Sequence, residues 1–230
     1  MIERLRGLFT LVQFTLTVSV VIILMYVVYS KNRIVRKVWA KMQVFLMGVK
    51  IVEHGQLDND ADMLMLNHQS ILDIVLFEAL GDRNIAWVAK KEIADIPWFG
   101  RILHAPKMII VERESKKSLI KLLKDSKDRL DDNRQLAIFP EGTRSDGTKI
   151  RKFKAGAKMI AEKFELKVQP VVVVGSYEVF RSKELKQKGG QVDIIYLDTV
   201  QAKRGTNWYE ELEKNMNEAF EKYSEKRKSE

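Results

Sequence analysis

An uncharged stretch near the N-terminus constrains the fold more than any other feature of the chain. Residues 8–29 read LFTLVQFTLTVSVVIILMYVVY, 22 residues without a charged side chain. As a helix this stretch would be roughly 33 Å long, which is enough to cross the core of a bilayer. The residues that follow, YSKNRIVRK, offer no small-residue cleavage site, and this disfavours a removed signal peptide. The stretch therefore predicts an apolar, membrane-associated helix over 8–29.

The next segment, residues 33–49, predicts a second helix of a different kind. One helical stripe is apolar, and it comprises Ile34, Val38, Trp39, Met42, Phe45, Leu46 and Val49. The other side of the helix is basic, with Arg33, Arg36, Lys37 and Lys41. Such a basic amphipathic helix is typical of the membrane interface. We therefore expect residues 1–50 to be membrane-associated and residues 51–230 to form a separate domain.

The charge of the chain is concentrated beside these helices. The net charge is +9, and the segment 31–50 alone carries six basic residues and no acidic one. This placement favours an anionic membrane surface over nucleic acid as the partner. The heavier positive end predicts that this side faces the cytoplasm. A single-pass anchor and a hairpin embedded in one leaflet both remain open.

Beyond residue 50, short apolar runs alternate with helical patterns. Buried strands are predicted at Met63–Leu66, Ile85–Ala89, Met108–Val111, Leu136–Phe139, Val168–Val174 and Val192–Leu197. Helices are predicted at about 70–80, 115–131, 155–165 and 206–225, and the charged tail reads as a frayed helix end. This alternation favours an α/β domain with a mostly parallel, mixed sheet flanked by helices.

A histidine and an aspartate follow the first of these strands in the stretch LNHQSILDIV. Ser70 and Asp73 fit a capping box, so we expect a helix to begin at Ser70. His68 then lies in the loop just before that helix. With a turn between the two residues, the Asp73 carboxylate can reach one imidazole nitrogen and leave the other free as a base. A capping box beside a solvated histidine is the alternative interpretation.

A second polar stretch, IFPEGTRSDG, follows another predicted strand. It places Glu141, Gly142, Thr143 and Arg144 at the carboxyl end of that strand, where open α/β sheets bind ligands. An arginine at such a place can bind a phosphate through two parallel hydrogen bonds. The lysines that follow fit a solvated basic face better than a binding site.

These two stretches carry a resemblance to a known family. NHQSILD and FPEGTRS resemble the first and third signature motifs of the glycerolipid acyltransferases, most closely the 1-acylglycerol-3-phosphate acyltransferases. VAKKEIADIPWFG through VER resembles the second block, with Lys90, Gly100 and Arg113 at matching positions, and VQPVVVVG resembles the fourth. The resemblance covers roughly residues 60–176. Ile93 and Gln169 depart from the usual pattern, and neither has an expected chemical role.

The resemblance implies an enzyme that transfers a fatty acyl group from a thioester to the sn-2 hydroxyl of 1-acylglycerol-3-phosphate, making phosphatidic acid in phospholipid biosynthesis. It implies that His68 is the general base and that Asp73 orients it. Arg144, Arg113 and Lys90 would hold the phosphate of the acceptor, with Gly142 and Thr143 in the same binding loop. Glu141 would bind the glycerol end or stabilise the loop.

The implied donor is acyl-CoA or an acyl carrier protein, with no cofactor. No metal site is expected, because His54 and His104 show no ligand spacing. The chain has no cysteine, so a thiol acyl-enzyme is excluded. Acylation of glycerol-3-phosphate or of a lyso-ornithine lipid remains an alternative. A non-enzymatic, membrane-tethered binder of anionic lipids is the alternative from another class.

Overall fold

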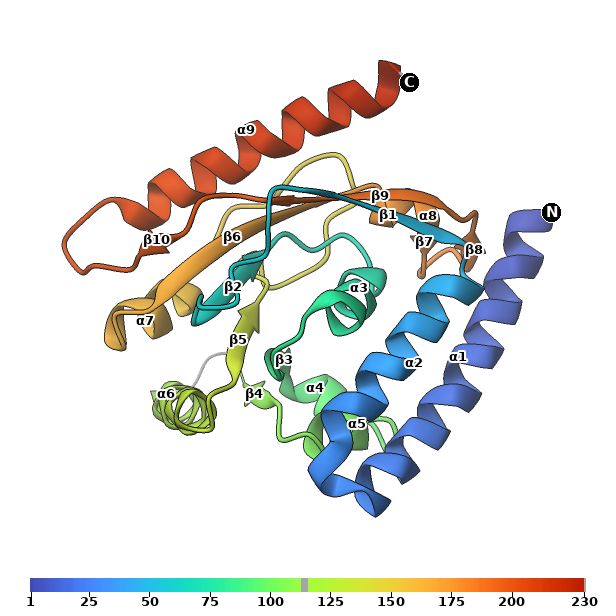
Figure 1. The fold of residues 1–230 in the computed structure, drawn as a ribbon, viewed down its shortest axis with the longest axis horizontal. Coiled ribbons are helices and arrows are strands. Elements are labelled where there is room, and N and C mark those ends of the chain that lie inside the picture. Colours follow the sequence, from blue (N-terminus) through green and yellow to red (C-terminus); the bar gives the residue numbers. More distant parts are fainter. Residues whose placement is uncertain (113–115, 230) are drawn as a thin grey trace.

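A mixed β-sheet forms the centre of the molecule. The computed structural model describes residues 1–112 and 116–229. The sheet has eight strands in the order β1-β9-β6-β2-β5-β3-β4, with β10 paired to β6 (Figure 1). Their bounds are β1 Val49–His54, β2 Met63–Leu66, β3 Ile85–Lys90, β4 Ile109–Val111, β5 Gln135–Ile138, β6 Lys167–Val174, β9 Gly190–Tyr196 and β10 Val200–Gln201.

Most neighbouring strands run parallel, as predicted. The central strands β6, β2, β5, β3 and β4 pair in parallel, and so do β1 and β9. The pairs β6–β9 and β6–β10 are antiparallel. All six predicted strands form, each within two residues of its predicted ends. Buried parallel strands read as continuous apolar runs, and this explains why they were recognisable.

Helices cover both faces of the sheet. One face carries α1 (Ile2–Val27), α2 (Asn32–Leu46) and α3 (Leu72–Leu80), whose apolar side chains share a core with those of β2, β3 and β9. The other face carries α6 (Lys116–Asp131), α7 (Ala155–Lys163) and α9 (Trp208–Ser229). Shorter helices are η1 (Tyr29–Lys31), α4 (Lys91–Ala94), α5 (Arg101–His104) and α8 (Ser176–Val179), and a small hairpin joins β7 (Phe180–Arg181) to β8 (Lys186–Gln187).

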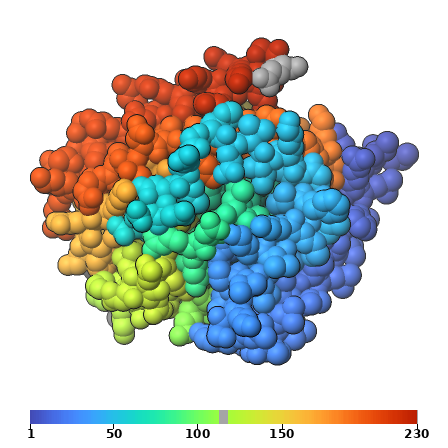
Figure 2. Space-filling view, viewed as in Figure 1, coloured from blue at the N-terminus to red at the C-terminus, as the bar shows by residue number. Residues whose placement is uncertain are grey.

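The two N-terminal helices pack side by side and form one continuous surface, blue in Figure 2. Polar side chains link them inside: Gln13 and Gln43 exchange hydrogen bonds, and Trp39 Nε1 donates to Thr17 Oγ at 3.0 Å. α1 is long and apolar enough to cross a membrane, by length and composition. However, Val18, Val21, Ile22 and Met25 on its inner side belong to the protein core.

The apolar stripe and the basic side of α2 have different surroundings. Most of the apolar stripe points outward, and Phe45 is 82% exposed. Two residues of the basic side point inward instead. Arg36, 3% exposed, pairs with Glu78 Oε1, and Arg33 pairs with Glu78 Oε2 at 2.8 Å. Arg33 and Arg36 therefore do not belong to the exposed basic surface, because a buried carboxylate of α3 binds both.

The junction between the helical pair and the sheet also differs from the prediction. The second helix was expected to reach residue 49, but it ends at Leu46, and Val49 already begins β1. β1 is an edge strand in which the exposed residues Lys50 and Glu53 are three apart, so its apolar residues continued the pattern of the preceding helix. The C-terminal tail is helical through Ser229, and Arg227 Nη1 lies 3.3 Å from Asp193 Oδ2.

Candidate active site

The sheet topology brings the predicted motifs together at one edge. β6, β2, β5 and β3 are neighbours and run parallel, so their carboxyl ends lie side by side. His68 follows β2, Glu141 to Arg144 follow β5, and Lys90 ends β3. The loops after β2 and β5 are joined directly, since Ser145 N donates to the His68 carbonyl oxygen at 2.7 Å. This edge is where open α/β sheets place their ligands.

His68 and Asp73 form the hydrogen-bonded pair that their spacing suggested. The His68 Nδ1 atom lies 2.9 Å from Asp73 Oδ2, and a carboxylate there requires Nδ1 to carry the proton. The Asp73 side chain is completely buried, whereas that of His68 is 14% exposed and lines a cavity. This arrangement leaves Nε2 as the nitrogen that can accept a proton from a bound hydroxyl.

The capping interaction forms only in part. The helix begins at Leu72, two residues later than expected. Ser70 Oγ accepts from Leu72 N at 3.3 Å, and the Asp73 carboxylate accepts from Ser70 N at 2.9 Å and Gln69 N at 2.7 Å. These bonds tighten the turn between His68 and Asp73, which is how residues five apart come into contact. Ser70 is 1% exposed and its hydroxyl donates to the Phe180 carbonyl oxygen.

The second oxygen of Asp73 is held by a residue that sequence reasoning missed. Ser176 Oγ donates a short hydrogen bond to Asp73 Oδ1, and both side chains are completely buried. Ser176 follows Gly175, which ends β6 with a positive φ of 93°. This left-handed backbone conformation favours glycine, and a Cβ there would also displace the Arg227 guanidinium, whose Cζ would lie 2.6 Å away. The sequence offers little signal for this contact beyond a glycine after a buried strand.

Glu141 lies behind the cavity wall and joins two loops. Its side chain is buried, with Oε1 accepting from His68 N at 2.6 Å and Oε2 accepting from Arg151 N at 2.7 Å. Both carboxylate oxygens thus bind backbone N–H groups of the two loops, which favours the loop-stabilising role for Glu141 over binding of the glycerol end. Burial raises the pKa of Glu141 to about 7, against the two backbone hydrogen bonds, which lower it.

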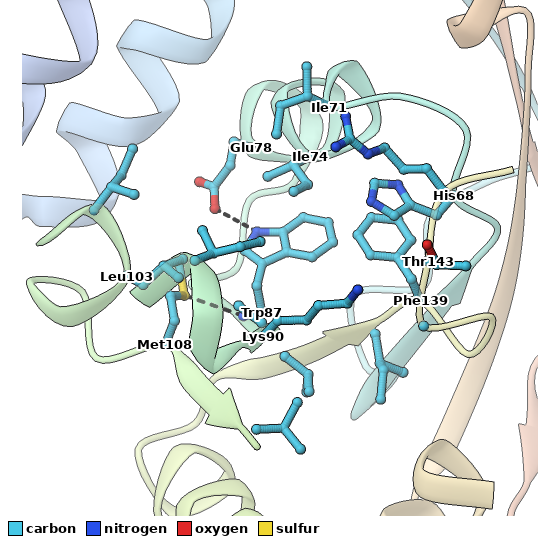
Figure 3. Close-up of a pocket in the computed structure, with 18 of the residues that line it drawn as sticks. His68, Ile71, Ile74, Glu78, Trp87, Lys90, Leu103, Met108, Phe139 and Thr143 are labelled. Carbon is cyan, nitrogen blue, oxygen red and sulfur yellow. Dashed lines mark hydrogen bonds between the residues drawn. The ribbon is translucent and has the colours of Figure 1, made fainter. Parts of the chain in front are cut away.

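A cavity of about 540 Å³ opens beside His68. Its wall includes a row of stacked rings: the His68 and Phe139 centroids are 3.8 Å apart, and those of Phe139 and Trp87 are 5.4 Å apart (Figure 3). At the far side of Trp87 from His68, the indole Nε1 donates to Glu78 Oε1 at 2.9 Å. Apolar residues from α1, α2, α3 and α5 line much of the remainder, including Val21, Trp39, Ile74 and Leu103. The volume and lining suit one or more aliphatic chains.

Cations gather around the same cavity. Lys90, Arg144, Lys154 and Lys183 all line it, as do Gly142 and Thr143. Arg144 Nη1 donates to Ser182 Oγ at 2.8 Å, which fixes one side of its guanidinium. Among the described lining residues the one carboxylate is Glu78, which already pairs with Arg33 and Arg36. The arrangement favours a ligand with an anionic end and an apolar end.

Two expectations concern residues elsewhere. Arg113 lies outside the described residues. His54 and His104 do not line the cavity. His54 Nε2 lies 2.9 Å from Asp193 Oδ1, and His104 Nε2 lies 3.2 Å from the Ala94 carbonyl oxygen. Within residues 1–112 and 116–229, no three His, Cys, Asp or Glu side chains are grouped so as to hold a metal ion.

Comparison with known proteins was made for both sequence and fold. The family model described as Acyltransferase matches residues 50–174. A 1-acyl-sn-glycerol-3-phosphate acyltransferase from Helicobacter pylori is 40% identical over 225 residues, covering 96% of this chain and 94% of the relative. A lyso-ornithine lipid O-acyltransferase from Rhizobium meliloti is 33% identical over 49% of this chain and 38% of the relative.

The fold also has a solved counterpart. The crystal structure of the 1-acyl-sn-glycerophosphate (LPA) acyltransferase PlsC from Thermotoga maritima superposes with a TM-score of 0.69 at 22% identity and covers 98% of both chains. The similarity therefore includes the two N-terminal helices as well as the sheet, and it concerns the fold alone.

Proposed function

Because the chain belongs to the acyltransferase family, we propose that it transfers a fatty acyl group from an acyl thioester to the sn-2 hydroxyl of 1-acylglycerol-3-phosphate, making phosphatidic acid. The observation that carries this proposal is the His68–Asp73 pair at the wall of a cavity with a cationic rim and an apolar interior. The relative from Helicobacter pylori, whose name states this activity, matches nearly the whole chain.

In the proposed reaction His68 is the general base. Nε2 takes the proton of the acceptor hydroxyl as its oxygen attacks the thioester carbonyl carbon, and the imidazolium that forms is stabilised by Asp73. The tetrahedral intermediate then collapses, the carbon–sulfur bond breaks, and the thiolate leaves with the proton from His68. The products are an ester and a free thiol, either CoA or the thiol of an acyl carrier protein. Attack is direct, so the chain's own residues form no covalent intermediate.

The proposal assigns the acceptor's phosphate to the cationic rim. Arg144 presents a planar fork of donors, and its link to Ser182 supports a fixed orientation. Lys90 lines the same cavity, and Arg113 is assigned to this group by motif resemblance alone. The role proposed for Glu141 is to hold the His68 backbone through its Oε1, which keeps the base at the cavity wall.

Residues 1–50 are proposed to hold the catalytic part, 51–230, at one face of the membrane. The inner side of α1 is part of the protein core, which supports a hairpin embedded in one leaflet rather than a free single span. The outward apolar surface of this hairpin includes Phe9, Leu16, Val20, Val38 and Phe45. Trp98 and Ile96 extend that surface, since Trp98 Nε1 donates to Ser19 Oγ of α1. We place the active site on the cytoplasmic side, where the thioester donors are delivered.

A panel of acceptors tests the acceptor assignment. Purified protein in anionic vesicles receives either an acyl-CoA or an acylated carrier protein together with 1-acylglycerol-3-phosphate, glycerol-3-phosphate, a lyso-ornithine lipid or 1-acylglycerol, and thiol release is measured. We expect release with 1-acylglycerol-3-phosphate above all others. Preference for the lyso-ornithine lipid would favour the second activity that a relative's name suggests. No acceptor-dependent release with either donor type would favour a non-enzymatic lipid binder.

Arg144→Lys tests the phosphate assignment within this reaction. A point charge cannot replace the two parallel hydrogen bonds of a guanidinium, so we expect the KM for 1-acylglycerol-3-phosphate to rise at least about tenfold. Use of 1-acylglycerol, which has no phosphate, should change much less. Equal losses on both acceptors would assign Arg144 to the fold of the loop and not to the phosphate.

A further inference from the structure

The hairpin formed by β7 and β8 lies outside the four blocks of motif resemblance, yet it touches the candidate active site. Its first strand is joined to the loop of the base, because the Phe180 carbonyl oxygen accepts from Ser70 Oγ at 2.8 Å. Its turn is joined to the other loop, because Ser182 Oγ accepts from Arg144 Nη1. The next residue, Lys183, lines the same cavity as His68 and Arg144. The hairpin therefore forms part of the wall at the cationic end.

Contacts with neighbouring elements also fix the position of the hairpin. The Gln187 side chain is buried and donates to the Met47 carbonyl oxygen, and Lys188 N donates to the Val179 carbonyl oxygen at 3.0 Å. α1 approaches the turn so closely that a Cβ at Gly7 would lie 1.9 Å from the Leu185 carbonyl oxygen. These contacts with the N-terminal helices and with α8 fix the backbone of the turn.

Charge pairing within the hairpin distinguishes Lys183 from its neighbours. Lys186 Nζ lies 2.6 Å from Glu184 Oε2, and Arg181 Nη1 lies 3.9 Å from the same oxygen. Among the described residues, no carboxylate lies within ion-pair distance of Lys183. Lys183 is exposed and flexible enough to reach a ligand, and its neighbour Ser182 holds the arginine assigned to the phosphate. An ammonium beside that guanidinium raises the local positive potential for an anion.

We propose that Lys183 is a further phosphate-binding residue, whose ammonium binds the phosphate of the lysolipid acceptor together with Arg144. The inference rests on the proposed acyltransferase function and extends its binding site to a segment that no motif includes. The two cations differ in their contribution. Arg144 orients the phosphate through its fork, whereas Lys183 supplies a mobile point charge that attracts and neutralises it.

A charge series at this position tests the proposal in the full-length protein. Lys183→Arg, Lys183→Gln and Lys183→Glu are compared with Lys188→Gln, a matched control on the same hairpin whose side chain does not line the cavity. For Lys183→Gln we expect a roughly 3- to 10-fold rise in the KM for 1-acylglycerol-3-phosphate, in the range of a charge-assisted contact at a partly exposed site. Lys183→Arg should stay near wild type, and Lys183→Glu should show the largest rise. kcat should change less than about twofold in Lys183→Gln, because a contact made equally in the ground state and the transition state affects KM and not kcat.

The KM values for the two acceptors and for the donor show which ligand Lys183 binds. The KM for 1-acylglycerol should be unchanged in all four variants, and the KM for acyl-CoA should be unchanged in Lys183→Gln. A rise in the acyl-CoA KM alone would overturn the proposal, because the ligand would then be a phosphate of the donor. An unchanged acceptor KM in Lys183→Gln, with an active wild-type enzyme, would also overturn it. Failure of the wild-type protein to acylate the acceptor would instead refute the proposed function itself.

Discussion

Ser176→Ala tests whether the hydroxyl group on the turn after β6 positions the catalytic pair. Asp73 Oδ2 has three donors, namely His68 Nδ1 and the backbone N–H groups of Gln69 and Ser70. Ser176 is the donor at Oδ1. Removing its hydroxyl leaves a completely buried carboxylate oxygen without that hydrogen bond, so the carboxylate that orients the imidazole is held at Oδ2 alone.

The expected magnitude follows from the type of bond that is lost. A hydrogen bond to a buried charged group contributes about 1.5–3 kcal/mol. The imidazolium forms only as the reaction proceeds, so the carboxylate contributes most in the transition state. If the transition state loses all of this free energy, kcat falls by about 10- to 150-fold, since 1.4 kcal/mol corresponds to a tenfold change. The KM for the acceptor should change little, because Ser176 is fully buried and does not line the cavity. Loss of folding stability should lower the Tm by roughly 3 to 12 °C.

Steady-state kinetics and thermal unfolding in detergent measure both effects. Ser126→Ala is the matched control, because Ser126 is also fully buried but its Oγ has no hydrogen-bond partner among the described residues. Ser176→Thr keeps the donor and should recover most of the kcat. A Ser176→Ala enzyme with kcat within about twofold of wild type would refute a positioning role for Ser176. A lower Tm with unchanged kcat would leave it a purely structural residue.

Three further predictions concern the base, the buried glutamate and the membrane surface. His68→Ala should lower kcat by about 100- to 10,000-fold while circular dichroism stays unchanged, and retention of more than about a tenth of the activity would contradict its role as base. Burial raises the pKa of Glu141 from 4.5 to about 7. Between these two pH values, Glu141 is therefore mostly protonated in the folded protein and mostly ionised in the unfolded protein. Stability from this group is therefore present below pH 4.5 and lost as the pH rises through 7, so Glu141→Gln should flatten the fall of Tm over that range. Phe45→Ser, at a side chain that is 82% exposed, should reduce flotation with vesicles at low and high salt alike, whereas Lys50→Ser should matter only at low salt. Equal salt sensitivity of the two variants would show that Phe45 does not insert.

Much of the sheet and the contact between His68 and Asp73 could be predicted because their signals are local. β2 and β6 lie in the buried centre and read as unbroken apolar runs. The His68–Asp73 contact spans five residues and depends on one turn, whose donors lie within the same stretch. Edge strands lack this advantage. β1 has its two exposed residues three apart, a spacing also found in helices, and it follows a helix whose apolar stripe continues into it, so period alone could not separate the two.

The parts that could not be predicted depend on partners far away in the sequence. Arg36 and Glu78 are 42 residues apart, and nothing near Arg36 indicates that a buried carboxylate will bind it. Helical periodicity shows that α2 has two faces, but it does not show which face meets the protein. Ser176 and Asp73 are 103 residues apart and meet only because β6 lies beside β2. Lys183 likewise enters the cavity through a hairpin that the sequence pattern did not distinguish from a loop.

The inward orientation of α2 also bears on how membrane binding and catalysis are linked. Arg33 and Arg36 pin α2 to Glu78, and Glu78 in turn binds the indole of Trp87, whose ring stacks on Phe139 beside His68. Breaking a buried ion pair by removing one partner costs several kcal/mol, so this connection resists deformation. The outward apolar stripe of α2 lies opposite these pairs. Under the proposed membrane orientation, the plane in which the stripe meets lipid sets how the cavity faces the headgroups. A foreign membrane anchor fused to residue 50 could restore attachment, but it would supply neither this orientation nor the α1 and α2 side chains that line the cavity.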